Sequence, residues 1–361
     1  MATTVRVSQA LPVTSLSTPA LVVDLDVFEA NVAAMGSLLR GTGKTVRPHV
    51  KTHRTPELAR RQLGGAAIGI TCATVGEAEA MVEAGIDDVL VANEVVDPGK
   101  VARLVALAQR ARIAVAVDDP EPVATLSREA ARVRATVDVL IDVDVLLHRC
   151  GVGSAQDAIR LAEAIDRAPG LRLRGVMGYE GRLRLKDAHR AGKIAGAYAT
   201  LAEVRASLLD AGFAVDVVSA AGTSTLPDAL ADPAITEVQA GVYALMEPEL
   251  LDLGLPFRCA AAIRGTVISR HPGRIVLDLG RRVVGMEYGP PVPIGFVATR
   301  IAISDEHAVI EMEDPLPLLG SHLDLAPGQI RTTFNLHDHV WISRGDRLID
   351  RWPITARGSS Q

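Results

Sequence analysis

Residues 88–119 read DVLVANEVVDPGKVARLVALAQRARIAVAVDD, and they hold two short β-branched runs on either side of a longer one. The first run (88–94) and the third (113–119) are short and rich in valine, alanine and isoleucine. The middle run (99–112) is amphipathic and rich in alanine, as is typical of a helix packed on one face. The stretch therefore predicts a strand–helix–strand unit in which the two strands are parallel.

The same alternation extends over about residues 18–245. Probable strands read at 20–26, 45–51, 67–74, 88–94, 113–119, 137–145, 173–181, 215–223 and 236–245. Probable helices read at 27–40, 75–85, 99–112, 155–166 and 194–212. Eight strand–helix pairs after the first strand would close a (β/α)8 barrel, which carries its catalytic groups at the carboxyl ends of its strands. A doubly wound sheet is the alternative, but no G-x-G-x-x-G follows the first strand.

Beyond about residue 255 the pattern changes. The runs at 260–270, 273–280, 296–304, 307–313 and 332–343 resemble strands separated by turns, with no convincing helix. We therefore expect an α/β protein with a barrel over residues 18–250 and an antiparallel β-strand domain from residues 1–17 and 251–361. The last residues, RGSSQ (357–361), are expected to form a loose tail.

Composition narrows the class of protein. The net charge is −5 without any basic block, which disfavours nucleic acid as a partner. No apolar run reaches transmembrane length and the first residues have no apolar signal region, so we expect no membrane association and a cytoplasmic location. Three distant cysteines do not suggest a disulfide framework.

The stretch VRPHVKTH (46–53) raises the question of amine chemistry. The chain has only five lysines, and four of them fall in predicted helices or the loops beside them. Lys51 is predicted to end the first barrel strand, with His49 and His53 alternating onto the same face. Neighbouring imidazoles and partial burial would lower the pKa of its amine, as Schiff-base formation requires. A solvated lysine is the other interpretation of this motif.

Several separated motifs carry a resemblance to a known family. TPALVVDLDVFEANVAAM, RPHVKTHRTPELARRQL, TVGEAEAMVEAGIDDVLVANEV and HRCGV resemble the D-threonine aldolase and D-serine dehydratase group. These are pyridoxal 5'-phosphate enzymes of fold type III, which have an alanine racemase-like barrel. The resemblance runs from about Thr18 to RWPITARG near the end of the chain, and it implies that Lys51 carries the cofactor as a Schiff base.

The resemblance also implies the other cofactor contacts. Arg149 in HRCGV matches an arginine near the cofactor's phenolic oxygen, and Tyr179 in GYEG matches a tyrosine near its ring. His49 is placed among the cofactor contacts beside Lys51. Small residues with free backbone N–H groups suit a phosphate, and two stretches supply them: SAAGTST, with Gly222 and Thr223, and QAGVY, with Gly241, Val242 and Tyr243.

The sequence departs from the family at a metal site. Lytic members carry His-x-Cys or His-x-Asp a few residues before an NL-x-D segment, and the pair holds a divalent metal (Mn, Mg or Zn). Here the two positions are Gln329 and Arg331. A guanidinium has no free lone pair for a metal, so the usual site is expected to be absent or to have moved. His337 and His339, on one face if they lie in a strand, are the alternative ligands.

The predicted function is aldolase-like cleavage of a β-hydroxy-D-amino acid by a homodimer. His53 could deprotonate the β-hydroxyl without a metal, and Arg331 could bind a substrate oxygen. Metal-independent racemisation, with Tyr288 as a candidate second base, remains open, as does dehydratase-like β-elimination. A non-catalytic cofactor carrier is disfavoured because such proteins generally lack the β-domain.

Overall fold

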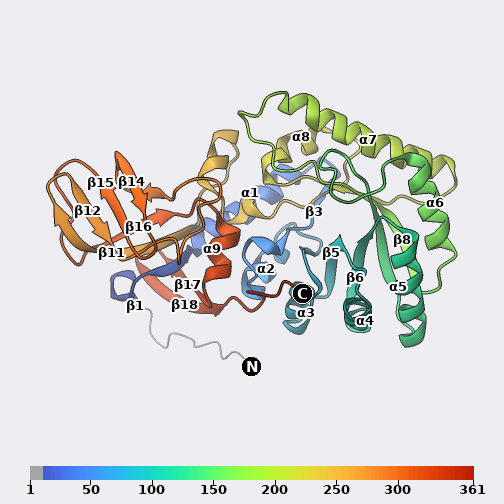
Figure 1. Cartoon of the computed structure of the whole chain (residues 1–361), viewed down its shortest axis with the longest axis horizontal. Coiled ribbons are helices and arrows are strands. Elements are labelled where there is room, and N and C mark those ends of the chain that lie inside the picture. Colours follow the sequence, from blue (N-terminus) through green and yellow to red (C-terminus); the bar gives the residue numbers. More distant parts are fainter. Residues whose placement is uncertain (1–10) are drawn as a thin grey trace. The chain divides into compact units, whose positions relative to one another are not determined.

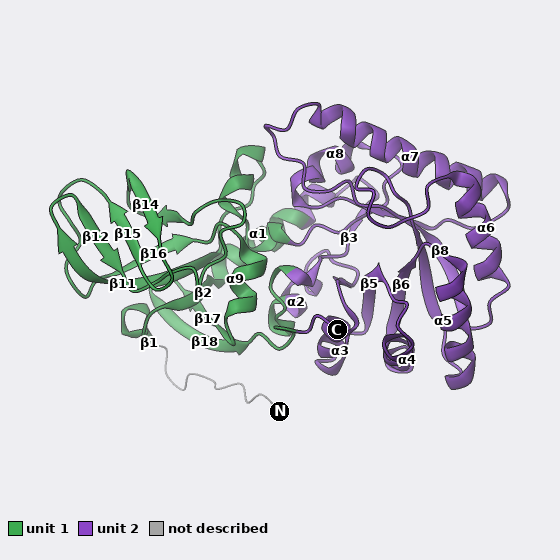
Figure 2. Cartoon of the chain, viewed as in Figure 1, with its two compact units in different colours: residues 1–35, 52–58, 242–358 green, residues 36–51, 59–241, 359–361 purple. Residues whose placement is uncertain are grey.

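The computed structural model describes residues 11–361, so residues 1–10 of the expected β-strand domain lie outside the described part. The chain divides into two compact units that interleave along the sequence (Figure 2). Unit 1 comprises residues 1–35, 52–58 and 242–358, and unit 2 comprises residues 36–51, 59–241 and 359–361. The chain therefore crosses between the units directly after Lys51 and directly after Gly241.

Unit 2 is built on an eight-stranded parallel sheet with the order β3-β10-β9-β8-β7-β6-β5-β4. Its strands are β3 (Thr45–Val46), β4 (Ile70–Cys72), β5 (Asp88–Glu94), β6 (Arg112–Val117), β7 (Val137–Asp142), β8 (Leu171–Met177), β9 (Val217–Ala220) and β10 (Glu237–Val238). Parallel bridges between Val46 and Ala67 and between His49 and Thr71 join the two outer strands. This arrangement confirms the predicted (β/α)8 barrel.

Helices cover the outside of this barrel (Figure 1). The helices of the chain are α1 (Leu25–Leu39), α2 (Pro56–Leu63), α3 (Val75–Glu83), α4 (Pro98–Leu107), α5 (Pro120–Val133), α6 (Ala155–Asp166), α7 (Arg190–Asp210), α8 (Leu226–Ala231) and α9 (Ile330–Leu336). The starts of α3 to α6 are fixed locally, because the side chains of Thr74, Asp97, Asp119 and Ser154 each accept a backbone N–H of the first turn.

The interior of the barrel is apolar, whereas the amino ends of its strands carry a network of ion pairs. Inside, Leu90, Ala116, Leu140 and Met177 of four successive strands form a buried cluster. At the amino ends of the strands, the buried Asp138 accepts ion pairs from Arg112, Arg172 and Arg174. A closed ion-pair network at this end is typical of a stabilising role, whereas chemistry belongs at the opposite rim.

Unit 1 is built on a ten-stranded sheet in which most neighbours are antiparallel. Its strands are β1 (Leu11–Pro12), β2 (Ala20–Asp24), β11 (Ala261–His271), β12 (Arg274–Leu277), β13 (Val292–Ile294), β14 (Arg300–Ile303), β15 (Ala308–Glu311), β16 (His322–Ala326), β17 (His339–Arg344) and β18 (Arg347–Pro353). The first predicted strand is β2, which pairs with β11 and β17. The appended β-domain is thus confirmed.

Three local predictions were wrong. The run 45–51 is not one strand, because Pro48 has no N–H for a ladder and residues Val50–Thr52 form a 3-10 helix. His49, Lys51 and His53 therefore do not alternate on a strand face. Part of the predicted strand at 332–343 is helix α9. The last residues are tied down, since the Gly76 N–H donates to the Gln361 carbonyl at 2.7 Å.

Candidate functional site

Lys51 lies in the 3-10 turn Val50–Thr52, beyond β3 and Pro48, at the carboxyl-end rim of the barrel. Its Nζ atom is 5.9 Å from the ring centroid of Tyr179, which follows β8. Strands β3 and β8 are not neighbours in the sheet, so the barrel's curvature brings these two side chains together. The strand-end lysine was found from sequence, and its partner ring came from the resemblance.

The same tyrosine also reaches the loop after β9. A Cβ atom added to Gly222 would lie 3.5 Å from Cε2 and 3.6 Å from the hydroxyl of Tyr179. The ring of Tyr179 therefore lies near Lys51 and Gly222 alike. The loop continues through Thr223, Ser224 and Thr225, whose side chains are small, hydroxylated and buried.

Arg149, His49 and Gly241 complete the predicted contacts within unit 2. Arg149 is exposed in the loop after β7 and has no hydrogen-bond or ion-pair partner in the described part of the chain. His49 is buried and bridges to Thr71 of the next strand segment. Gly241 is buried just beyond β10. An arginine without a partner at this rim is a cation that an anionic ligand can use.

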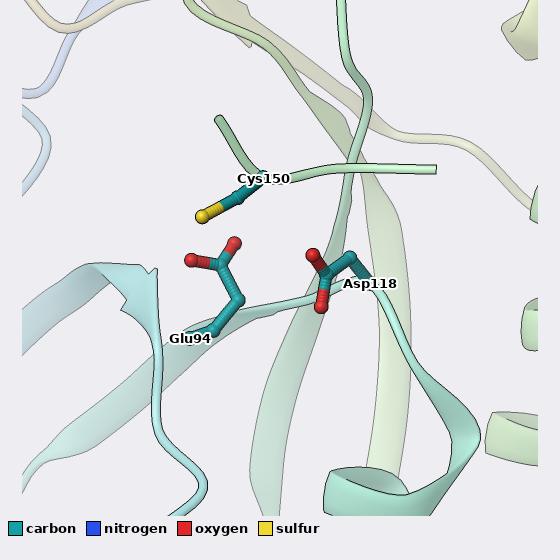
Figure 3. A group of neighbouring side chains, drawn as sticks. All are labelled: Glu94, Asp118 and Cys150. Atoms are coloured by element: carbon teal, nitrogen blue, oxygen red, sulfur yellow. The ribbon is translucent and has the colours of Figure 1, made fainter. Parts of the chain in front are cut away.

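Two carboxyl side chains and one thiol lie close together on the same rim. This group was not predicted from the sequence. Glu94 ends β5, Asp118 follows β6, and Cys150 follows Arg149, and one donor atom of each lies within 4.8 Å of the others (Figure 3). Among residues 11–361 this is the one such group with metal-type donors. The sequence did contain a signal for this group, because Glu94 and Asp118 each stand at the end of a barrel strand.

Burial and the neighbouring carboxylates raise the pKa values of two side chains at this place, Asp142 and Cys150. Burial, with Glu94 and then Asp118 beside it, raises the pKa of Asp142 to about 8, and Arg149 opposes the shift. Burial and a hydrogen bond with Glu94 raise the pKa of the Cys150 thiol to about 11. At neutral pH, Asp142 therefore holds its proton and Cys150 stays a thiol.

The predicted residues of unit 1 are described separately. Gln329 starts helix α9, and its Oε1 accepts a hydrogen bond from the hydroxyl of Thr332. The Arg331 guanidinium carbon lies 5.4 Å from the ring centroid of Tyr288, and Nη2 donates to the tyrosine hydroxyl at 3.1 Å. Tyr243, which follows Val242, is buried and packs against Phe257 with ring centroids 5.4 Å apart.

The histidines of unit 1 are engaged in local contacts. His53 is fully buried, lies edge-on to Phe334, and accepts the Thr55 N–H on Nδ1 at 3.1 Å. His337 ends helix α9, and its ring donates Nε2–H to the Val283 carbonyl at 2.8 Å. His339 begins β17. The predicted shared strand face for His337 and His339 was wrong, because only His339 is in a strand.

The barrel side of the site fits a phosphorylated, aldehyde-bearing cofactor. A lysine amine, an aromatic ring, a loop of small hydroxylated residues and an arginine without a partner gather at one rim. Each matches one part of pyridoxal 5'-phosphate: the aldehyde carbon, the ring, the phosphate and the phenolic oxygen. The small side chains of the loop would let a phosphate oxygen approach its backbone.

Comparisons place the chain in a class of protein. The alanine racemase N-terminal domain matches residues 23–248, and a serine dehydratase domain matches residues 260–343. The chain therefore belongs to the alanine racemase N-terminal domain family.

Among individual proteins, the chain is 37% identical to a D-threonine aldolase from Arthrobacter sp, over 97% of this chain and 95% of that one. It is 32% identical to a 3-hydroxy-D-aspartate aldolase from Paracoccus denitrificans, over 95% and 92%. A crystal structure of D-threonine aldolase from Filomicrobium marinum superposes with a TM-score of 0.93 at 35% identity, covering 98% of this chain and 99% of that one. These similar proteins are lyases by name. None of the helices in residues 11–361 combines the length and apolar character needed to cross a bilayer.

Proposed function

We propose that this protein is a pyridoxal 5'-phosphate-dependent lyase that cleaves a β-hydroxy-D-amino acid into glycine and an aldehyde. The observation that carries the proposal is the approach of Lys51, Tyr179 and Gly222 at one barrel rim. The aldolases at 32% and 37% identity support the reaction type. When bound, the cofactor would withdraw electrons from the substrate's α-carbon, so that a bond to that carbon can break.

The predicted contact residues would hold and orient the cofactor. Lys51 would form the covalent link through its amine, and Tyr179 and His49 would fix the ring beside it. Thr223 and Gly241, followed by Val242 and Tyr243, would supply backbone N–H groups to the phosphate, and Gly222, which has no side chain, would let the loop approach it. We propose that the cofactor-binding domain is residues 18–250 and the second domain residues 1–17 and 251–361.

Arg149 would supply the fixed charge at the ring oxygen. Its guanidinium is exposed and has no competing partner within residues 11–361. A guanidinium is charged throughout the accessible pH range, so it would stabilise a phenolate oxygen at any working pH.

Cofactor binding is tested by absorbance. Purified protein with pyridoxal 5'-phosphate should show a visible band that survives dialysis, and Lys51→Ala should lose it. Lys44→Ala is a matched control, because Lys44 donates to the carbonyls of Asp232 and Ile235 at another place in unit 2. A band that persists in Lys51→Ala would overturn the assignment.

The base that accepts the β-hydroxyl proton is proposed to be His53. The lone pair of its neutral ring lies on Nδ1, which accepts from the Thr55 N–H, so accepting a proton requires that bond to open. His53→Gln should then lower kcat and leave the cofactor band intact. Unchanged kcat would assign the base elsewhere.

Arg331 is proposed to bind a substrate oxygen, either the β-oxygen or a second carboxylate. Loss of a buried, bidentate charge pair costs about 2–5 kcal/mol, so Arg331→Ala should lower kcat/KM by at least tenfold. Arg351→Ala is the matched control, because that guanidinium lies over Trp341 in a comparable contact at 5.3 Å. Equal losses in the two variants would contradict a substrate role.

Metal dependence separates this role from a relocated metal site at His337 and His339. Activity is measured before and after exhaustive EDTA, and again after manganese or zinc is restored. Activity that is unchanged by EDTA is expected. Activity that disappears and returns with metal would overturn the metal-independent proposal and point to the histidines or to another metal site.

A racemase is the second candidate function. The observation favouring it is Tyr288, whose hydroxyl accepts a hydrogen bond from Arg331 and is thereby oriented. Products distinguish the reactions: retro-aldol cleavage yields glycine and an aldehyde, racemisation yields the L-enantiomer, and β-elimination yields ammonia and a keto acid. Glycine formed from D-threonine or 3-hydroxy-D-aspartate is the expected result.

We propose that the protein is a homodimer in the cytoplasm. Ile268, Val292 and Ile294 are apolar residues exposed on the sheet of unit 1, an arrangement that a second copy could cover. Cys72, Cys150 and Cys259 are all free thiols, as suits a reducing compartment. Sedimentation of the loaded enzyme as a monomer at micromolar concentration would overturn the dimer.

A further inference from the structure

Glu180, directly after Tyr179, is a buried carboxyl that the proposed chemistry does not use. Only 1% of the residue is exposed. Its Oε1 accepts a hydrogen bond from the hydroxyl of Tyr198 on α7, at 3.1 Å, and another from the hydroxyl of Thr225. Its Oε2 is buried and has no hydrogen-bond partner among the described residues.

One of these contacts reaches the proposed phosphate loop, Gly222–Thr225. Thr225 Oγ1 accepts the Gly222 N–H at 3.2 Å and donates to Glu180, so one hydroxyl links the first residue of the loop to the buried carboxyl. Ala221, just before the loop, has a positive φ of 67°, a conformation that a residue with a Cβ adopts at some cost. Such a conformation persists only where its surroundings fix it.

The other side of the loop is held by an ion pair. Arg190, at the start of α7, donates to the Ser224 carbonyl at 2.7 Å and to Asp228 at 2.9 Å. Helix α7, which carries Tyr198, has the charged residues Arg190, Lys193, Glu203, Arg205 and Asp210, and α8 has Asp228. Arg190 and Asp228 form an ion pair with each other, and neither contacts the Glu180 carboxyl.

Burial favours the neutral form of Glu180. Two hydroxyls donate to Oε1, which can accept both in either protonation state. An ionised Oε2 without a partner would be a desolvated charge, which is costly, whereas a proton on Oε2 removes that charge. Burial raises the pKa of Glu180, although the hydroxyls and the N–H groups of Glu180 and Ala221 oppose the shift.

We propose that Glu180 is a positioning residue that stays neutral and fixes the Gly222–Thr225 loop in the conformation that binds the cofactor's phosphate. This inference rests on the proposed function, because it assumes that the loop binds pyridoxal 5'-phosphate. A neutral carboxyl suits the place, since an ionised one would repel a phosphate dianion held by the adjoining loop.

The test compares two variants and two ligands. Glu180→Gln keeps a neutral group with an acceptor oxygen, whereas Glu180→Leu leaves the Thr225 and Tyr198 hydroxyls without their acceptor. Dissociation constants are measured by equilibrium dialysis of cofactor-free protein with pyridoxal 5'-phosphate and with pyridoxal, which lacks the phosphate. Thermal unfolding of each variant checks the fold.

The expected pattern is selective for phosphate. Glu180→Leu should weaken pyridoxal 5'-phosphate about tenfold or more, as expected for loss of a buried hydrogen-bonding partner, and should leave pyridoxal binding nearly unchanged. Glu180→Gln should bind both ligands like the parent protein. An equal loss for both ligands, or no loss for either, would overturn the inference.

Two further measurements examine the charge of Glu180. Parent affinity for pyridoxal 5'-phosphate should fall as pH rises through the raised pKa of Glu180, and Glu180→Gln should lose that fall. Infrared difference spectra should show a protonated carboxyl in the parent that Glu180→Gln lacks.

These outcomes separate the inference from the proposed function. Cofactor binding that responds to neither variant, or a carboxylate signal at neutral pH, would refute the role of Glu180 alone. A parent protein that fails to bind the cofactor would refute the proposed function and this inference together.

Discussion

Asp142→Asn should change how the stability of the barrel unit depends on pH. Asp142 ends β7, is 7% exposed, and shares a hydrogen bond with Glu94. Burial and the neighbouring Glu94 and Asp118 raise the pKa of Asp142 to about 8. An unfolded aspartate titrates near 4, so folded and unfolded states bind different numbers of protons in between.

The sign of the effect follows from that difference. Between about pH 4 and pH 8 the folded state holds a proton on Asp142 that the unfolded state has released, so stability falls as pH rises. The contribution is fully present below about pH 4 and is lost as pH passes through about 8.

The magnitude follows from the width of the window. Four pH units at 1.36 kcal/mol each give an upper bound of about 5 kcal/mol, and relaxation of the rim around the ionised pair lowers this to about 2–5 kcal/mol. Asparagine keeps a neutral group that can hydrogen-bond Glu94. Asp142→Asn should therefore lose most of this decline in the free energy of unfolding between about pH 5 and pH 8.

Urea unfolding of cofactor-free protein, followed by far-ultraviolet circular dichroism across that window, measures the effect. Asp210→Asn is the control, since Asp210 is exposed at the end of α7 and has no partner in the described part of the chain. Parallel pH profiles for Asp142→Asn and the parent would refute the raised pKa of Asp142.

Three further outcomes are expected. Asn31→Ala should lower the free energy of unfolding by about 2–4 kcal/mol, measured by urea titration, because buried Asn31 makes three hydrogen bonds of 2.8–3.0 Å to backbone groups. Cys150, whose thiol pKa is raised to about 11, should react slowly with iodoacetamide at neutral pH. Glu94→Gln should speed this alkylation, measured by mass spectrometry of the peptide that contains Cys150. An unchanged rate would contradict the hydrogen bond between Cys150 and Glu94. Gly175→Ala should abolish soluble expression, because its Cβ would lie 1.9 Å from the Val217 carbonyl oxygen; a soluble, stable variant would refute that clash.

The barrel was predictable because its signals are local. Each strand is a short β-branched run, and each helix from α3 to α6 begins at a residue that caps it. Lys51 was predicted from its place beside a barrel strand, whereas Tyr179 and Gly222 came from the family resemblance; all three follow strands whose carboxyl ends share a rim.

Helix α9 could not be predicted because its stability comes from distant residues. Its sequence includes β-branched Ile330, Thr332 and Thr333, which favour strands. The helix instead begins where the Ile330 N–H donates to the buried carboxyl of Glu247, 83 residues earlier, at 3.0 Å. Phe334 then buries its whole side chain in the same unit. Neither contact is visible in the local pattern.

The charge of the rim also departs from what a count of residues suggests. Glu94, Asp118, Asp142 and Glu180 lie at the ends of β5 to β8, and Arg149 and Lys51 lie on the same rim, so a simple count gives a negative site that would repel a phosphorylated ligand. Burial changes this count, because it raises the pKa of Asp142 to about 8 and the raised pKa of Glu180 favours its neutral form. Arg149, which has no ion-pair partner within residues 11–361, then faces fewer negative charges. The rim can accept an anionic cofactor because the fold, and not the sequence alone, sets which of its acids are ionised.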